Sequence, residues 1–260
     1  MYHPKLVLGH RGHIATVTFD RPEVHNAFDL SMWRGLRNTM DALSARDELR
    51  CVVLRGAGME AFSVGIDIAA MPAELGTPEQ EAVFARVFDE AMQSIRQCSH
   101  PVVAMIMGHC LGGGAGIATM CDFRVGGEGV RFGITANRMG VWYPYAGIDR
   151  LIELVGTGVA AELLIEGRIL DGREAYEKGV LSRVVPDASV EADALALAAR
   201  IAKGAPLAAR FHKAAIRRLR GPLPVTAEDE RAASLFVETE DFRDACQAFL
   251  EKREPVFTGR

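Results

Sequence analysis

The sequence of 260 residues lacks an excess of positive charge, the first of several informative absences. Its 30 Lys and Arg residues are outnumbered by 34 Asp and Glu residues, and its formal net charge is −4 at pH 7. A domain that binds nucleic acid neutralises phosphates with clustered cations and is usually basic. We therefore expect no nucleic acid among the partners of this protein.

Long apolar runs are also missing. No stretch reaches the roughly 18 uninterrupted apolar residues of a membrane-spanning helix, and the N-terminal MYHPKLVLGHRGH lacks the apolar centre and cleavage site of a secretory signal. The five cysteines form no CxxC pair, and four of them lie in apolar stretches, where reduced cysteine acts as a small hydrophobic residue. These absences predict a cytoplasmic protein that does not bind a membrane.

Motifs for nucleotides and metals are absent as well. The pattern GxxxxGK followed by Ser or Thr does not occur, and GGGAG (112–116) lacks the GxGxxG spacing of a dinucleotide-binding turn. The seven histidines form no HExxH pair or comparable ligand set. We therefore expect neither a metal nor a resident cofactor.

Short apolar runs alternate with helical patterns in the first half of the chain. The runs IATVTF (14–19), CVVL (51–54) and VVAMIM (102–107) are typical of buried strands. Apolar spacings of three and four predict helices over about 30–43 and 79–97. This alternation indicates an α/β fold. The inward-facing positions of the second helix would be Val83, Val87, Met92 and Ile95.

The second half of the chain is patterned mainly as helix. From about residue 156 onward we predict one short strand, at 183–185, among several helices, and we predict a single helix over 227–250. The chain therefore ends in an α-rich region.

Two glycine-bearing loops each follow a predicted buried strand. In the second, GGG (112–114) leads into a helix that we expect to begin near Gly113, and the amides at a helix N-terminus are unpaired donors that stabilise negative charge. The first, AFSVGIDI (61–68), could supply a second donor of an oxyanion site. The alternative is that the glycines serve only tight packing between strand and helix.

Four segments resemble the crotonase superfamily, also called the enoyl-CoA hydratase/isomerase family, and their order and spacing match it across nearly the whole chain. They are RPEVHNAF (21–28), AFSVGIDI (61–68), HPVVAMIMGHCLGGGAGIATMCDFRV (100–125) and EGRILDGREAYEKGVLSRVVP (166–186). The resemblance implies a spiral of ββα units over residues 1–195 that holds the acyl-CoA site, and a helical trimerisation region over 196–260. It also implies homotrimers, which often pair into hexamers, and coenzyme A only as part of the substrate.

The resemblance also implies site residues. The amides of Ile66 and Gly113 would bind the thioester carbonyl. Asp67 lies at a position that the family associates with loop architecture, so we favour a turn-capping role for it over acid/base catalysis. Residues predicted to line the coenzyme A side are Asn26, Ala27, Ala61, Ser63, Asp67, Ile68 and Ala69.

Two glutamates that hydratases of this family use have no counterpart in this sequence. The alignment of motifs puts Gly116 and Ala136 in their places. Water addition needs groups that activate water and protonate the α-carbon, each worth about 10²–10⁴ in rate. Because glycine inside a helix usually has a packing or space reason, we expect extra room at Gly116 beside the thioester.

The resemblance also implies that residues 140–148, an aromatic segment, wall the acyl pocket. It contains Trp142, Tyr143 and Tyr145, and GVWYPYAGIDRL is similar to the matching stretch of methylmalonyl-CoA decarboxylase, a crotonase relative with a tyrosine at the position of Tyr143. That relative has a histidine where Ile66 stands here. Tyr143 could donate a proton, or the three rings could simply shape the pocket.

Three functions remain open from the sequence. The first is an acyl-CoA lyase or isomerase, similar to enoyl-CoA hydratase, that forms a thioester enolate. The second is a malonyl-CoA-type decarboxylase or C–C hydrolase that uses Tyr143. The third is a protein that binds acyl-CoA without catalysis. Loss of both glutamates with retention of GGG is expected under each.

Overall fold

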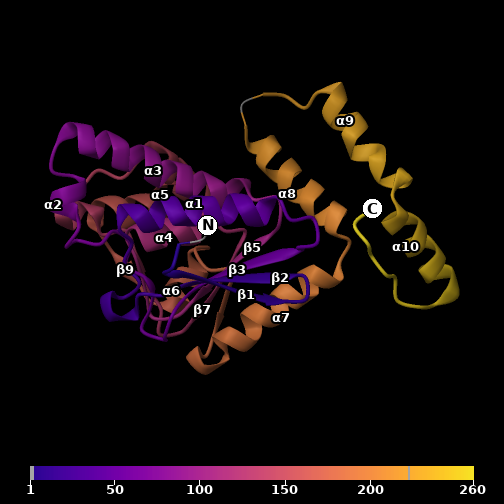
Figure 1. The fold of residues 1–260 in the computed structure, drawn as a ribbon, viewed down its shortest axis with the longest axis horizontal. Coiled ribbons are helices and arrows are strands. Elements are labelled where there is room, and N and C mark those ends of the chain that lie inside the picture. Colours follow the sequence, from indigo (N-terminus) through magenta and orange to yellow (C-terminus); the bar gives the residue numbers. More distant parts are fainter. Residues whose placement is uncertain (1–2, 222) are drawn as a thin grey trace.

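A six-stranded sheet lies at the centre of the computed structural model, which describes residues 3–221 and 223–260 (Figure 1). The first two strands are antiparallel, and every other neighbouring pair is parallel. Parallel neighbours need crossover connections, so helices cover the faces of this sheet. In sheet order the strands are β1 (Leu6–Arg11), β2 (Ile14–Phe19), β3 (Cys51–Gly56), β5 (Val102–Ile106), β7 (Phe123–Gly127) and β10 (Arg183–Val185).

Both faces of the central sheet are buried, as the continuous apolar runs predicted. In β3, Val52 and Leu54 belong to the larger hydrophobic core, while Cys51 and Val53 belong to a second core on the opposite face. Helix α7 (Val190–Lys203) packs against that opposite face. The predicted boundary between residues 195 and 196 therefore lies inside a helix that packs on the core.

A second, four-stranded sheet carries the two glycine-bearing loops. Its strands are two or three residues long and lie in the order β4-β6-β8-β9, with only the last pair antiparallel. Strands β4 and β6 are parallel neighbours, so the loops that follow them emerge at the same edge. The strands are β4 (Ala61–Ser63), β6 (His109–Leu111), β8 (Arg131–Gly133) and β9 (Ile169–Leu170).

Helices α1 (Leu30–Ser44) and α3 (Pro78–Gln97) lie side by side on the face opposite α7 (Figure 1). Both helices begin after an N-capping residue. The Asp29 side chain accepts a hydrogen bond from the Met32 amide, and the Thr77 side chain accepts one from the Gln80 amide. Helix α4 (Gly113–Met120) contacts α3 and strands β4 and β6 of the second sheet, and the short helix α2 (Met71–Glu74) contacts α3.

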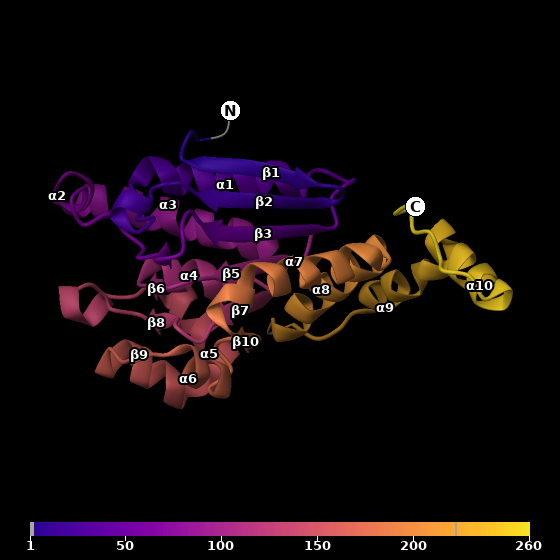
Figure 2. The ribbon, with the colours of Figure 1, turned by 90° about the horizontal axis from the view of Figure 1, so that it is seen from below.

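The last two helices project away from the sheets, as Figures 1 and 2 both show. We call residues 227–251 the C-terminal arm. The single helix predicted over 227–250 is wrong, because a 3-10 turn at Leu235–Glu238 and a new cap at Thr239 divide it. The remaining helices of the chain are α5 (Tyr145–Ala161), α6 (Gly172–Glu177), α8 (Pro206–Arg220), α9 (Ala227–Ser234) and α10 (Glu240–Glu251).

Short irregular turns complete the secondary structure. They are 3-10 turns at Pro22–Val24, Ala136–Met139 and Asp187–Ser189, and a π-helical turn at Glu162–Glu166. Within residues 3–221 and 223–260, none of the helices has the length and apolarity that crossing a bilayer requires.

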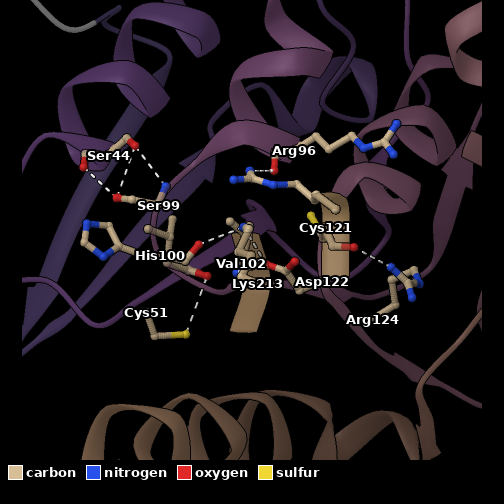
Figure 3. Close-up of polar contacts among 12 residues, drawn as sticks. Ser44, Cys51, Arg96, Ser99, His100, Val102, Cys121, Asp122, Arg124 and Lys213 are labelled. Atoms are coloured by element: carbon tan, nitrogen blue, oxygen red, sulfur yellow. Dashed lines mark hydrogen bonds and ion pairs between the residues drawn. The ribbon is translucent and has the colours of Figure 1, made fainter. Parts of the chain in front are cut away.

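A buried lysine ties α8 to the core (Figure 3). The Lys213 ammonium donates to the Asp122 carboxylate at 2.6 Å and to the His100 carbonyl at 2.8 Å. Asp122 also accepts the amide of Val102, at the start of β5. The His100 ring is buried, its Nε2 lies 3.1 Å from the Leu43 carbonyl, and burial lowers its pKa to about 4.

Candidate active site

A cavity of about 580 Å³ lies between α3, the two glycine-bearing loops and the 135–144 segment. Most of its lining is apolar, and only one of its lining residues is charged among those that the structure describes. The lining residues are Val64, Ile66, Ile68, Met71, Leu75, Glu81, Phe84, Ala85, Phe88, Gly112, Gly113, Thr135, Ala136, Met139, Gly140, Val141, Trp142, Tyr143 and Pro144.

Buried polar side chains fix the first loop. The Ser63 hydroxyl donates to the Asn26 carbonyl at 2.8 Å and accepts the Gly65 amide at 3.0 Å. The Asn26 side-chain amide donates to the carbonyls of Ala61 and Ala57, and its oxygen accepts the amide of Arg21. These bonds consume both side chains, so their role in the structure is to hold the main chain of the loop.

The main chain around Ile66 leaves its amide free. The Phe28 amide donates to the Gly65 carbonyl at 2.7 Å, and the Asp67 amide donates to the Phe28 carbonyl at 2.9 Å. Successive amides of an extended chain point to opposite sides. The Ile66 N–H therefore points away from Phe28, and no residue of the described chain accepts a hydrogen bond from it.

The second loop meets the first so closely that only glycine fits. A Cβ on Gly65 would overlap the amide nitrogen of Gly113, and a Cβ on Gly114 would overlap the Ser63 carbonyl. Beneath Gly113 lies the indole of Trp33, about 3.1 Å from where a Cβ would be. Helix α4 begins at Gly113, as predicted, so its amide has no partner within the helix, and no other described residue accepts from it.

Two free amides thus lie next to each other beside one cavity. Ile66 and Gly113 both line it, and the second amide lies at the N-terminus of α4. Donors that are fixed before a reaction stabilise an oxygen that gains negative charge, because they do not have to reorganise. This pair of amides is suited to a carbonyl that becomes an oxyanion.

Other residues of the first loop support its shape. The Asp67 carboxylate pairs with Arg21 at 2.9 Å and accepts the Ala69 amide at 3.1 Å, which is the geometry of a turn cap. Ile68 lines the cavity, whereas Ala69 is exposed outside it. Asn26, Ala27, Ala61 and Ser63 are buried behind the loop, and their contact with coenzyme A stays a prediction.

The space beside Gly116 is already filled. A Cβ there would lie 2.7 Å from the Tyr143 hydroxyl and 3.1 Å from Cε of Met92. The prediction of extra room at this glycine is therefore wrong, because the phenol reaches into it. The hydroxyl has no hydrogen-bond partner among the described residues, and burial raises the pKa of Tyr143, so the phenol stays protonated at neutral pH.

The rest of the aromatic segment is more exposed. Trp142 lines the cavity although the residue is 94% exposed, while Tyr145 is 92% exposed and does not line it. Ala136 lines the cavity at the start of a 3-10 turn. Substrate contacts by Trp142 and Tyr145 stay predictions.

Sequence reasoning missed the contribution of α3 to the cavity. Glu81, Phe84, Ala85 and Phe88 recur at helical spacing along its lining face. The nearby Thr135 hydroxyl was also missed. The spacing of the phenylalanines was a usable signal, but a wall of a cavity and an ordinary core face have the same periodicity. Within the described residues, no group of three His, Cys, Asp or Glu side chains is arranged to hold a metal.

Comparisons with known proteins agree with this geometry. A family model described as enoyl-CoA hydratase/isomerase matches residues 9–260. The short-chain-enoyl-CoA hydratase of Clostridium acetobutylicum is 32% identical over 252 residues, which are 96% of this chain and 95% of that protein. A putative enoyl-CoA hydratase of Thermus thermophilus is 34% identical over 257 residues, 95% of this chain and 98% of that protein.

Solved structures agree as well. The crystal structure of an enoyl-CoA hydratase/carnithine racemase from Magnetospirillum magneticum matches with a TM-score of 0.97 at 40% identity, over 99% of this chain and 97% of that one. An enoyl-CoA hydratase from Bacillus anthracis matches with a TM-score of 0.90 at 30% identity, over 98% and 100% of the two chains. The predicted crotonase-type α/β fold is confirmed, and the chain belongs to the enoyl-CoA hydratase/isomerase family.

Proposed function

We propose that the protein is an acyl-CoA enzyme of the lyase or isomerase type, in which the amides of Ile66 and Gly113 hold the thioester carbonyl as it becomes an enolate. The observation that carries this proposal is the pair of adjacent amides that line one cavity and have no acceptor in the described chain. Family membership supports the CoA thioester as the ligand. One such donor is typically worth about 10²–10³ in rate.

The lining of the cavity argues against an ordinary hydratase mechanism. Gly116 and Ala136 stand where the resemblance predicts glutamates, and the one carboxylate that lines the cavity in the described chain is Glu81, on the outer part of α3. Without a nearby base, activation of water would lose about 10²–10⁴ in rate. The enolate would then have to form by a route that starts without a protein base.

Decarboxylation or another C–C cleavage is the second candidate, and the observation that favours it is the Tyr143 hydroxyl beside Gly116. In a malonyl-type thioester the bond between the α-carbon and the carboxylate would break, CO₂ would leave, and the electron pair would pass to the thioester oxygen. Tyr143 would give its proton to the α-carbon, and solvent would return a proton to the phenolate. No base is needed to begin this sequence.

We also propose that the protein works as a homotrimer, or as a hexamer formed by two trimers. The C-terminal arm supports this, because it lies away from the sheets (Figure 2) and its large apolar residues Phe236, Phe249 and Leu250 are exposed. Clustered apolar surface of this kind usually marks an interaction site. The number of subunits is taken from the resemblance to the family.

Binding and turnover of enoyl-, malonyl- and β-ketoacyl-CoA esters test the proposed function. We expect calorimetric binding of CoA esters, together with turnover or exchange of the α-protons in D₂O. Gly65→Ala should lower either rate by about 10²–10³, because its Cβ would displace the Gly113 amide. Gly58→Ala is the matched control, since Gly58 also has a positive φ, +75°, but a Cβ there would meet only Pro22, at an ordinary contact distance of 3.9 Å.

The outcomes separate the three candidates. Release of CO₂ from a malonyl-type ester would favour decarboxylation over the other reactions. Binding without exchange or turnover would overturn the catalytic role and leave an acyl-CoA binding protein. Absence of binding to every ester would overturn the proposal as a whole.

A further inference from the structure

One carboxylate lines an otherwise uncharged cavity. Glu81 is in the first part of α3, and no Lys, Arg or His of the described chain lies within 4 Å of its carboxylate. The other 18 lining residues are neutral at pH 7. A bound acyl chain would therefore meet a single fixed negative charge along its whole length.

The position of Glu81 along α3 separates it from the reacting carbonyl. Phe88 packs against Trp33 with ring centroids 4.8 Å apart, and Trp33 lies under Gly113, so Phe88 marks the level of the free amides. Glu81 precedes Phe88 by seven residues, or about 10 Å along the helix axis at 1.5 Å per residue. Glu81 is thus too far from the thioester to act on its α-carbon.

Burial along the same face indicates where the cavity opens. Phe84 and Phe88 are 5% and 7% exposed, whereas Glu81 and Trp142 lie in exposed positions. A carboxylate and an indole face both attract a cation, the first by charge and the second through its π system. Both residues line the same cavity as Phe84 and Phe88, on its exposed side.

We propose that Glu81 reads the charge at the distal end of the acyl group, so that the site favours long acyl chains with a cationic end and disfavours those with a carboxylate end. This inference rests on the proposed function and names a substrate class for the same site. Short acyl groups would end before they reach Glu81 and should be indifferent to it.

Saturated CoA esters allow a test that does not depend on turnover. Chains of four, eight and twelve carbons would end in a trimethylammonium group, in a tert-butyl group of the same shape, or in a carboxylate. Calorimetry should give dissociation constants that fall about fivefold for the cationic end and rise about fivefold for the anionic end, relative to tert-butyl, with the longest chain only. Added salt should shrink both differences, because the site is partly exposed.

Two variants separate a local contact from the general field of the protein. Glu81→Gln should abolish the charge preference and leave the affinity for tert-butyl esters unchanged. Glu79→Gln removes the same charge two residues away, at a position that does not line the cavity, and should keep the preference.

The result that overturns this inference is a charge preference that is absent at every chain length, or one that persists in Glu81→Gln. Tight binding of all esters with no preference would leave the proposed function intact. Failure of every ester to bind would instead be a failure of the proposed function, so the two can be told apart.

Discussion

Gly116 and Tyr143 act as a pair, because the phenol occupies the space that any side chain at residue 116 would need. Tyr143 cannot easily swing away, since Gly147 lies against its ring, where a Cβ would be 2.5 Å from Cε1. We predict that Gly116→Ala destabilises the fold by up to about 2 kcal/mol, an overpacking cost of about 1–3 kcal/mol less the helix gain of about 1 kcal/mol.

A double-mutant cycle measured by urea denaturation checks this pair. Tyr143→Phe should recover about 1 kcal/mol of the Gly116→Ala loss, because it removes the atom that clashes. Gly158→Ala, at a helical glycine with open space around it, should be neutral or stabilising and should not couple to Tyr143→Phe. Additive effects in the Gly116 cycle would contradict the contact.

The same hydroxyl gives a kinetic prediction. If Tyr143 protonates the enolate carbon, Tyr143→Phe should lower kcat by about 10²–10⁴ and change the dissociation constant of the CoA ester little. Because burial raises the pKa of Tyr143, the wild-type pH profile should show no alkaline loss from this phenol below about pH 10. Unchanged turnover in the variant would leave the ring as part of the pocket wall only.

At the scale of elements, long periodic segments were predictable and short ones were not. Strand β2 matches its predicted range, and α3 differs from it by one residue. Strands β4, β6, β8 and β9 have at most three residues, too few for a pattern, and tertiary pairing alone defines them. On α3, Val83 is 37% exposed and Phe84 is buried instead, because the helix face that packs cannot be fixed to one residue from spacing.

The turn between α3 and β5 gives a pH-dependent prediction, through His100. Burial lowers the pKa of this ring to about 4, against about 6.5 in the unfolded chain. Between pH 6.5 and 4 the unfolded state therefore binds more protons than the folded state. As the pH is lowered through this range, the free energy of unfolding should fall by up to about 1.4 kcal/mol per pH unit. Above pH 7 His100 is neutral in both the folded and the unfolded state, so it no longer makes the stability depend on pH.

Urea denaturation of wild type and His100→Gln between pH 4 and 8 checks that prediction. The variant keeps a side-chain donor for the Leu43 carbonyl and should have a shallower acid slope than wild type. The two proteins should have parallel stability profiles above pH 7. Equal slopes below pH 6 would show that other groups govern the loss of stability in acid.

For the whole molecule, the family resemblance in the sequence pointed to residues of the two glycine-bearing loops but not to the outer wall of the cavity. The family resemblance implied Ile66 and Gly113, and the structure places both beside the cavity, while their role toward a thioester stays a prediction. Glu81 could not be named from the sequence, because it lines the cavity only through the way α3 packs beside the second loop. The contact between Gly116 and Tyr143 joins residues 27 positions apart and needed the fold as well.

The C-terminal arm gives a prediction about assembly. On α10, Phe249 and Leu250 are 84% and 76% exposed, and burying a large apolar side chain is worth about 1.5–3 kcal/mol. A second copy of the chain that covered these two side chains would gain this free energy and would bury no charge from them. We expect sedimentation of a trimer or hexamer, and of smaller species for the variant with both Phe249→Arg and Leu250→Arg. Val7→Arg, at an exposed apolar residue of β1 outside the arm, should leave the assembly unchanged, and a wild-type monomer at micromolar concentration would contradict the role of the arm.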